Sequence, residues 1–192
     1  IEPFDRRNQR AFGFDMYQND IRRTAMDQAR DTNTAVATGV ITLVQEIDED
    51  VQPGFLILVP FYGNTENAED LEGRRRNIIG YVYSPFRAID FIDGAIKNDK
   101  SDDIKFRITD TTDSTSPSEL YNTVGDDFEE QFANAPFREV KNLEVAGRIW
   151  TITFFSSNGF ADKNSHNNFI LVLIGGLAID ILVTFIIYIL ST

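Results

Sequence analysis

The apolar run from Phe169 to Leu190 constrains the setting of this chain more than any other feature. The only residues in this run that are not apolar are two glycines, Thr184, Tyr188 and Asp180. At about 1.5 Å per residue, a helix here reaches about 33 Å, enough to cross a hydrocarbon core of about 30 Å. A helix in the core of a water-soluble domain carries a polar face, and this segment has none. The sequence therefore predicts a transmembrane helix at 169–190.

Asp180 lies near the middle of this predicted helix, with no basic residue in the apolar run on either side. A charge at that depth costs about 2.5–3.5 kcal/mol on insertion scales. One interpretation is that the segment is apolar enough to insert with Asp180 neutral and idle. The other is that Asp180 makes a polar contact with a second helix, on a face that it shares with Gly176 and Thr184.

The residues before this segment have the composition of a folded, acidic domain. Hydrophobic residues make up 42% of the chain and include 16 Phe, which is enough for a packed core. The formal net charge of −12 repels nucleic-acid phosphates, so we expect no nucleic-acid partner. There is no cysteine, and the single histidine, His166, lies beside the predicted membrane helix. We therefore expect no disulfide, no metal, no cofactor and no enzyme activity in this chain.

Hydrophobic patterning favours an α+β fold with antiparallel sheets, because helices and strands follow one another without a regular βαβ period. In the first half, a capped amphipathic helix is predicted from residue 19 or 20 to 32 or 33, with Ile21, Ala25 and Ala29 on its apolar face. Strands are predicted at 35–46, at 55–62 (buried on both faces, with Pro60 at a bulge or edge) and at 78–83. A polar loop is predicted at 63–76, and a helix that starts at Ser84-Pro85 is predicted through Ile92.

A charged connector at 94–103 predicts a boundary between two subdomains, 1–95 and 96–160, with a second connector at 161–168 before the membrane helix. The second subdomain is predicted to open with a strand at 104–109 and a turn-rich loop at 110–118. Residues 120–132 predict no definite element. The strongest hairpin signal is Ala146-Gly147, between predicted strands at 137–145 and 148–156.

Seven short motifs occur in an order and spacing that resemble the CHASE domain. They are Gly13-Phe-Asp15, Ala29-Arg-Asp-Thr32, Val40-Ile-Thr-Leu-Val-Gln-Glu46, Pro53-Gly-Phe-Leu56, Pro60-Phe-Tyr62, Gly80-Tyr-Val-Tyr-Ser-Pro-Phe86 and Gly147-Arg-Ile-Trp150. No single motif is specific to this family. The order of all seven over nearly all of residues 1–160 is specific. The CHASE domain is the extracytoplasmic sensor of membrane-bound histidine kinases, diguanylate cyclases and phosphodiesterases, and of plant cytokinin receptors. The family's first membrane span, stalk helix and opening strands have no counterpart here.

This resemblance implies two PAS-like subdomains, of which the membrane-distal one binds a small-molecule ligand. In plant relatives, an Asp at the position of Asp15 hydrogen-bonds the ligand, and the strand that matches 35–46, which includes Ala37, lines the pocket. The resemblance further implies a homodimer in the cell inner membrane, with the sensory domain in the periplasm. It gives a binding site without giving the identity of the ligand.

Each candidate ligand-binding residue also has a structural interpretation. Asp15 is either a pocket carboxylate or a cap at a strand end, and Glu46 is either a pocket residue or a solvated strand end. Thr32 is most simply a turn residue after the helix. The other candidates are most simply core residues, although a PAS-like pocket is itself lined by the core: Phe14, Phe55, Leu58, Tyr81 and Tyr83.

Two classes of function remain. The favoured one is a sensory domain that binds a small molecule and transmits the bound state through the membrane helix. The chain begins without Met and ends soon after the membrane segment, so we expect a longer protein with a cytoplasmic kinase or cyclic-di-GMP enzyme domain. The alternative is a structural or adhesion protein, anchored by its C-terminal tail and without signalling output.

Overall fold

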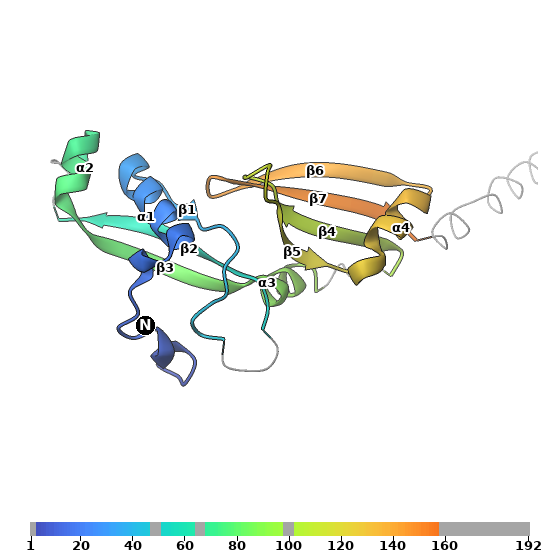
Figure 1. The fold of residues 1–192 in the computed structure, drawn as a ribbon, viewed down its shortest axis with the longest axis horizontal. Helices are drawn as coiled ribbons and strands as arrows, with labels where there is room; N and C mark the ends of the chain where they lie inside the picture. Colours follow the sequence, from blue (N-terminus) through green and yellow to red (C-terminus); the bar gives the residue numbers. More distant parts are fainter. Residues whose placement is uncertain (1–2, 47–50, 64–67, 98–101, 158–192) are drawn as a thin grey trace, which may run out of the picture.

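The computed structural model describes residues 3–46, 51–63, 68–97 and 102–157 (Figure 1). Two antiparallel sheets follow one another along the long axis of the molecule, and each has helices packed against it. The predicted α+β class with antiparallel sheets is confirmed. Among the described residues, no helix is long and apolar enough to cross a membrane. The predicted span at 169–190, with Asp180, and the connector at 161–168 lie outside the described residues.

The first sheet has the strand order β1-β2-β3 and carries α1 on one face (Figure 1). The elements of this half are η1 (Asn8–Ala11), η2 (Met16–Gln18), α1 (Asp20–Thr32), β1 (Val36–Ala37), β2 (Gly54–Tyr62), α2 (Leu71–Asn77), β3 (Ile78–Arg87) and α3 (Ala88–Ala95). Among the described strands, β3 pairs with β2 alone, so its other edge is free.

The helix α1 forms where the sequence predicts it, since both of its ends carry local signals. The Asn19 side chain accepts a hydrogen bond from a backbone N–H of the first turn at 3.1 Å. Asn33 ends the helix in the left-handed conformation, and its N–H bonds back to the helix. Ala25 and Ala29 are buried in one cluster with Leu58 of β2, and these small side chains let the helix lie close to the sheet.

The predicted strand at 35–46 is wrong beyond its first residues. Only β1 pairs as a strand. After it, the Thr38 N–H donates to the Leu56 carbonyl at 2.8 Å, and an isolated bridge joins Ile41 to Gly54. The backbone N–H of Leu56 donates to the Thr38 hydroxyl, at 3.0 Å, and not to a backbone carbonyl. Ile41 and Leu43 are buried beneath α1. The content of β-branched residues predicted a strand here, but the packing under the helix decides the path of the chain.

The strand at 55–62 was predicted to be buried on both faces, and this is true only of its first half. Leu58 is buried, whereas Val59 and Phe61 are exposed, because β1 is too short to flank the rest of the strand. The prediction for Pro60 is confirmed, since beyond Leu58 only β3 pairs with β2 and the register shifts between Phe61 and Tyr62.

The segment 63–76 was predicted as a loop, but it contains the helix α2. The Asp70 side chain caps α2 by accepting a hydrogen bond from the Gly73 N–H at 2.6 Å. Arg75 pairs with Asp31 at the C-terminal end of α1, with 2.6 Å between Nη2 and Oδ2. An ionic contact of this kind leaves no apolar period in the sequence, which is why patterning missed the helix.

The start of the next helix was also predicted wrongly. Ser84 and Pro85 continue β3, and α3 begins only at Ala88. Proline is tolerated there because β3 is an edge strand. The Gln52 side chain caps α3 from a distant part of the chain, accepting from the Ile89 N–H at 2.9 Å and from the next N–H at 3.2 Å.

The second sheet has the strand order β5-β4-β7-β6. Its elements are β4 (Ile104–Asp110), β5 (Ser118–Asn122), η4 (Gly125–Asp127), α4 (Phe128–Asn134), β6 (Arg138–Val145) and β7 (Arg148–Ser156). The predicted strand at 104–109, the loop after it and the hairpin are confirmed. Ala146 and Gly147 both have positive φ, as a two-residue hairpin turn requires. The helix α4, for which patterning gave no signal, packs Phe128 against Phe155 of β7 at 5.2 Å between ring centroids.

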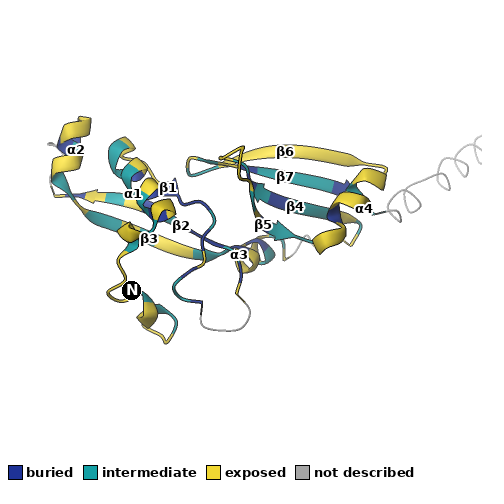
Figure 2. Ribbon diagram, in the orientation of Figure 1, coloured by how far each residue is buried: buried dark blue, intermediate teal, exposed yellow. Residues whose placement is uncertain are grey.

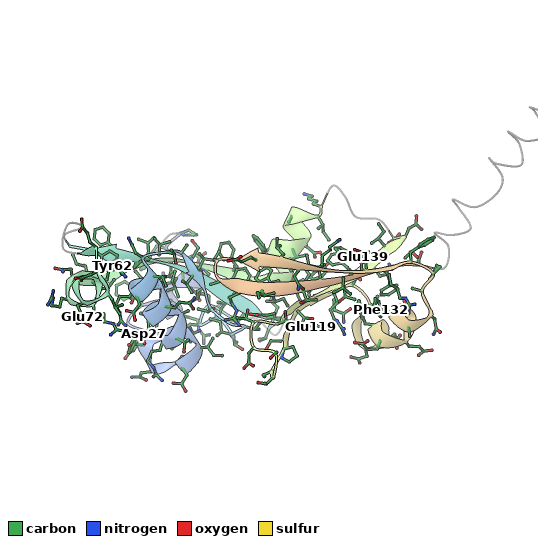
Figure 3. The ribbon with its side chains drawn as sticks, turned by 90° about the horizontal axis from the view of Figure 1, so that it is seen from above. Asp27, Tyr62, Glu72, Glu119, Phe132 and Glu139 are labelled. Carbon is green, nitrogen blue, oxygen red and sulfur yellow. The ribbon has the colours of Figure 1, made fainter. Side chains whose placement is uncertain are left out.

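The two sheets share an apolar cluster at their junction. Figure 2 shows buried residues on the ribbon near α3, where the two sheets meet. Phe55 of β2 lies 5.1 Å from the Trp150 ring of β7 and 5.1 Å from the Phe86 ring of β3. The Ala37 N–H donates to the carbonyl of Ala146 in the hairpin, at 2.8 Å. Away from this junction the halves diverge, with Tyr62 and Asp27 at one end of the molecule and Phe132 and Glu139 at the other (Figure 3). The predicted boundary after residue 95 falls at the end of α3.

Candidate functional site

A groove of about 720 Å³ lies along β3 in the first sheet. Three parts of the chain line it: the N-terminal segment at residues 3–8, the stretch after β1 with Leu43 and Gln45, and residues 81–87 of β3. The groove therefore contains Tyr81 and Tyr83, two of the residues that the sequence predicted for ligand binding. It also brings together segments that are far apart in sequence, as a binding site commonly does.

A recess of about 10 Å³ adjoins this groove and shares Leu43, Gln45 and Tyr83 with it. Phe14, a third predicted residue, lines the recess together with Arg22 of α1. The recess can hold about one water-sized group. The groove and the recess together form the candidate site.

Arg22 is the functional candidate that the sequence analysis missed. Its residue is 5% exposed, whereas Ile21, which was predicted to face the core, is 43% exposed. Arg22 lies three residues before Ala25 and seven before Ala29, so the same helical period was compatible with an inward Arg22. The Arg22 guanidinium lies 5.1 Å from the centre of the Phe14 ring, and its Nη2 donates to the Thr42 carbonyl at 3.0 Å. Burial lowers the pKa of Arg22.

Asp15 caps η2 in this structure. Its side chain is exposed and accepts a hydrogen bond from the Tyr17 N–H at 2.9 Å. Asp15 lies between Phe14 and Met16, both of which line the recess. Asp15 is therefore a cap, although of a short 3-10 helix and not of a strand end as predicted, and its pocket role stays a prediction.

Glu46 is not a solvated strand end, because its side chain is only 3% exposed. It accepts a hydrogen bond from Arg87 at the end of β3, with 2.9 Å between Oε1 and Nε. Arg87 also pairs with Asp90 at 2.6 Å. Burial alone would lower the pKa of Arg87, but the hydrogen bonds and charges of Glu46 and Asp90 together outweigh this effect and raise the pKa. Arg87 lines the groove at the end where β3 becomes α3, whereas Glu46 itself lines neither the groove nor the recess.

The remaining predicted residues lie outside the groove and the recess. Thr32 is exposed at the far end of α1 and donates to the Gln28 carbonyl. Ala37 lies against the hairpin, and Phe55 and Leu58 are buried in separate clusters. Phe55 and Leu58 are three residues apart on one strand, so their side chains point to opposite faces of the sheet.

Tyr81 bridges the groove and the helix. Its hydroxyl donates to the Met26 carbonyl of α1 at 3.0 Å, and burial raises the pKa of its phenol. Tyr81 and Tyr83 are both half-buried and pack against the cluster beneath α1. They are therefore core residues and groove residues at once, as the sequence analysis allowed.

A second groove, of about 510 Å³, lies between α3 and the second sheet. Lys105, Phe106 and Tyr121 line it, and no residue predicted for ligand binding lies there. The Tyr121 hydroxyl donates to Asp93 at 2.7 Å. Burial and this hydrogen bond raise the pKa of Tyr121 to about 12. Within the described ranges, no group of His, Asp or Glu residues has the arrangement of a metal site.

Residues 1–121 match the family model of the CHASE domain. The chain belongs to the CHASE domain family. CHASE domains are extracellular sensory domains of signalling receptors. No curated protein matches the chain in sequence.

The two grooves differ in whether they lie within the residues that match the CHASE domain. Every residue that lines the groove along β3 lies within the matched range. The second groove is built in part by Thr123 and Phe154, which lie beyond it. The match ends in β5, so it is shorter than the resemblance over 1–160, and the motif from Gly147 to Trp150 lies outside it.

Proposed function

We propose that this CHASE domain is the ligand-sensing part of a transmembrane receptor, and that it binds a small molecule in the groove along β3. The groove supports the proposal because it is concave, lies within the range matched by the family and combines aromatic with polar side chains. Its volume of about 720 Å³ falls in the range of small-molecule sites.

The surroundings of the groove provide a route for the signal. Bound ligand would contact the N-terminal segment, the stretch after β1 and β3 together, and would favour an arrangement in which these segments are close. β3 leads directly into α3, whose Ile92 packs in the cluster with Trp150 of β7. A shift of β3 would therefore reach the last strand before the predicted membrane helix.

In this proposal the domain lies in the periplasm and is held in the cell inner membrane by the predicted helix at 169–190. The receptor works as a homodimer, and a cytoplasmic histidine kinase or cyclic-di-GMP enzyme domain supplies the output. The chain itself performs no catalysis. The extracellular sensory character of CHASE domains supports this placement.

The test is a thermal-shift screen of small molecules against the full chain in detergent micelles. A ligand at about 100 times its Kd stabilises the folded state by about 2.7 kcal/mol, which raises the melting temperature measurably. Gln45→Trp fills the groove along β3, and Lys105→Trp adds the same bulk to the second groove. Neither side chain makes a hydrogen bond in the described part of the chain.

We expect Gln45→Trp to abolish the shift and Lys105→Trp to preserve it, with both variants folded by circular dichroism. A shift that survives Gln45→Trp but not Lys105→Trp would move the binding site to the second groove. A shift unaffected by either substitution would contradict both locations.

A further inference from the structure

Arg22 is the most buried arginine among the described residues, and it has no carboxylate partner there. Its exposed fraction is 5%, and its guanidinium makes one side-chain hydrogen bond, to the backbone carbonyl of Thr42. A guanidinium has five N–H donors and a full charge, and burying such a charge without a counter-ion is costly. A buried cation of this kind indicates an anionic partner that the described residues do not supply.

Three other partly buried arginines each pair with a carboxylate. Arg30 pairs with Asp31 at 2.7 Å, Arg87 pairs with Glu46 at 2.9 Å, and Arg148 pairs with Asp110. Each of these three side chains is about a fifth exposed, so each retains more contact with water than Arg22 does. Arg74 of α2, which is also partly buried, donates only to the backbone carbonyls of Asp31, Ala68 and Glu69. Arg22 differs from it in depth of burial, and an unpaired charge costs most where water is excluded.

The place of Arg22 connects this exception to the candidate site. Arg22 and Phe14 line the recess of about 10 Å³. Gln45 and Tyr83 line both this recess and the groove. The Phe14 ring covers one face of the guanidinium at 5.1 Å, and the N–H donors of arginine point outward in its own plane. The recess has room for one water-sized group, such as an oxygen of a carboxylate.

The overall charge does not oppose such a role. The chain carries a net charge of −12, but fields from exposed charges are screened beyond about 8–10 Å in physiological salt. A buried guanidinium acts at contact distance in a medium of lower dielectric constant, where a charge-assisted hydrogen bond is strong. An acidic surface is therefore compatible with recognition of an anion at Arg22.

We propose that Arg22 anchors the ligand and that the sensed molecule is a small organic carboxylate. Its carboxylate pairs with the guanidinium in the recess, and its apolar body lies in the groove against Phe14 and Tyr83. This inference rests on the proposed function, because it names the ligand class of the same groove.

The experiment measures binding of small monocarboxylic acids, each paired with its primary amide, to the full chain in detergent micelles by calorimetry at pH 7. We expect the acid to bind at least about 30-fold more tightly than its amide, since the amide leaves the buried charge unpaired. Arg22→Gln should weaken binding of the acid by at least about 30-fold, so that the protein no longer binds the acid more tightly than the amide. Arg23→Gln is the matched control, because Arg23 is the next residue on α1, its side chain is 41% exposed and it pairs with Asp20. This substitution should leave both affinities unchanged.

A second measurement needs no ligand. If Arg22 lacks an internal counter-ion, Arg22→Met without ligand should melt no lower than the wild type, since it removes an uncompensated charge. The acidic run Asp48-Glu49-Asp50 lies outside the described residues, and neutralising it by Asp48→Asn, Glu49→Gln and Asp50→Asn should not alter the effect of Arg22→Met. A lower melting temperature for Arg22→Met that disappears in this neutralised background would identify an internal partner and overturn the inference.

The outcomes also separate this inference from the proposed function. Uncharged compounds that bind wild type and Arg22→Gln equally, and are blocked by Gln45→Trp, would overturn the role of Arg22 and leave the groove as the binding site. Carboxylates whose binding survives Gln45→Trp would overturn both.

Discussion

Phe55 was a candidate for ligand binding, and its position predicts that it instead couples the two halves of the molecule. The side chain is 2% exposed and contacts three aromatic rings. The centroid distances are 5.1 Å to Phe86, 5.1 Å to Trp150 and 5.9 Å to Phe91. Phe86 belongs to the first sheet and Trp150 to the second, so Phe55→Ala opens a cavity at the junction between them.

The size of the effect follows from the area and the contacts. A buried Phe removes about 150–250 Å² from water, which corresponds to about 4–6 kcal/mol at 25 cal/mol/Å². This figure is an upper bound, because the unfolded chain is already partly compact. Phe-to-Ala substitutions in packed cores cost about 3–5 kcal/mol. We therefore expect Phe55→Ala to lower the free energy of unfolding by about 4 kcal/mol, a large share of the 5–15 kcal/mol typical of a domain.

Urea unfolding of the full chain in detergent micelles measures this loss. Trp150 is the single tryptophan and lies in the second sheet, so its fluorescence reports on the junction, and circular dichroism reports on both halves. Phe61→Ala is the matched control, because Phe61 lies on the same strand and is 57% exposed; it should cost less than about 1 kcal/mol. A loss below about 1.5 kcal/mol for Phe55→Ala, or equal losses for the two variants, would refute the coupling role.

Three further predictions concern single carboxylates. Hydrogen bonds from Arg75 and Arg30 hold the pKa of Asp31 well below its ordinary value of 3.8. Asp31 therefore stabilises the fold at pH 7, and this contribution is lost as the pH falls below about 4 toward the folded-state pKa. Asp31→Asn should lower the melting temperature at pH 7, and the difference in melting temperature between this variant and the wild type should become smaller in acid. Asp15→Asn retains a capping side chain, so we expect unchanged stability with a weaker response to ligand; lost stability with an unchanged response would leave Asp15 a cap alone. Asp180→Leu should still insert in the membrane but weaken dimer association measured by energy transfer between labelled chains, and unchanged association would leave Asp180 without a role.

Features set by neighbours in the sequence were predictable. The helix α1 is fixed by Asn19 at its start and Asn33 at its end, and the hairpin by the two positive-φ residues Ala146 and Gly147. The central run of β2 is apolar enough to be a strand wherever it packs. These signals act within a few residues, and they were sufficient for the α+β class and for the resemblance to the CHASE family.

Features set by distant partners were not predictable. The helix α2 is held to α1 by Arg75 and Asp31, and α3 is capped by Gln52, whose place beside Ile89 is created only by the fold. Leu43 is buried under α1 instead of continuing a strand. In each case the stabilising group lies more than ten residues away, where no local pattern records it.

The candidate site shows the same division most clearly. Its aromatic residues Tyr81 and Tyr83 follow from the alternation of a strand, since both point to the side of the sheet that carries α1. The apolar period of α1, by contrast, fits either Ile21 or Arg22 as its first inward residue, because adjacent positions on a helix differ by only about 100°. The position of the sheet beneath the helix, together with the Phe14 ring and the Thr42 carbonyl, turns Arg22 inward and leaves Ile21 exposed.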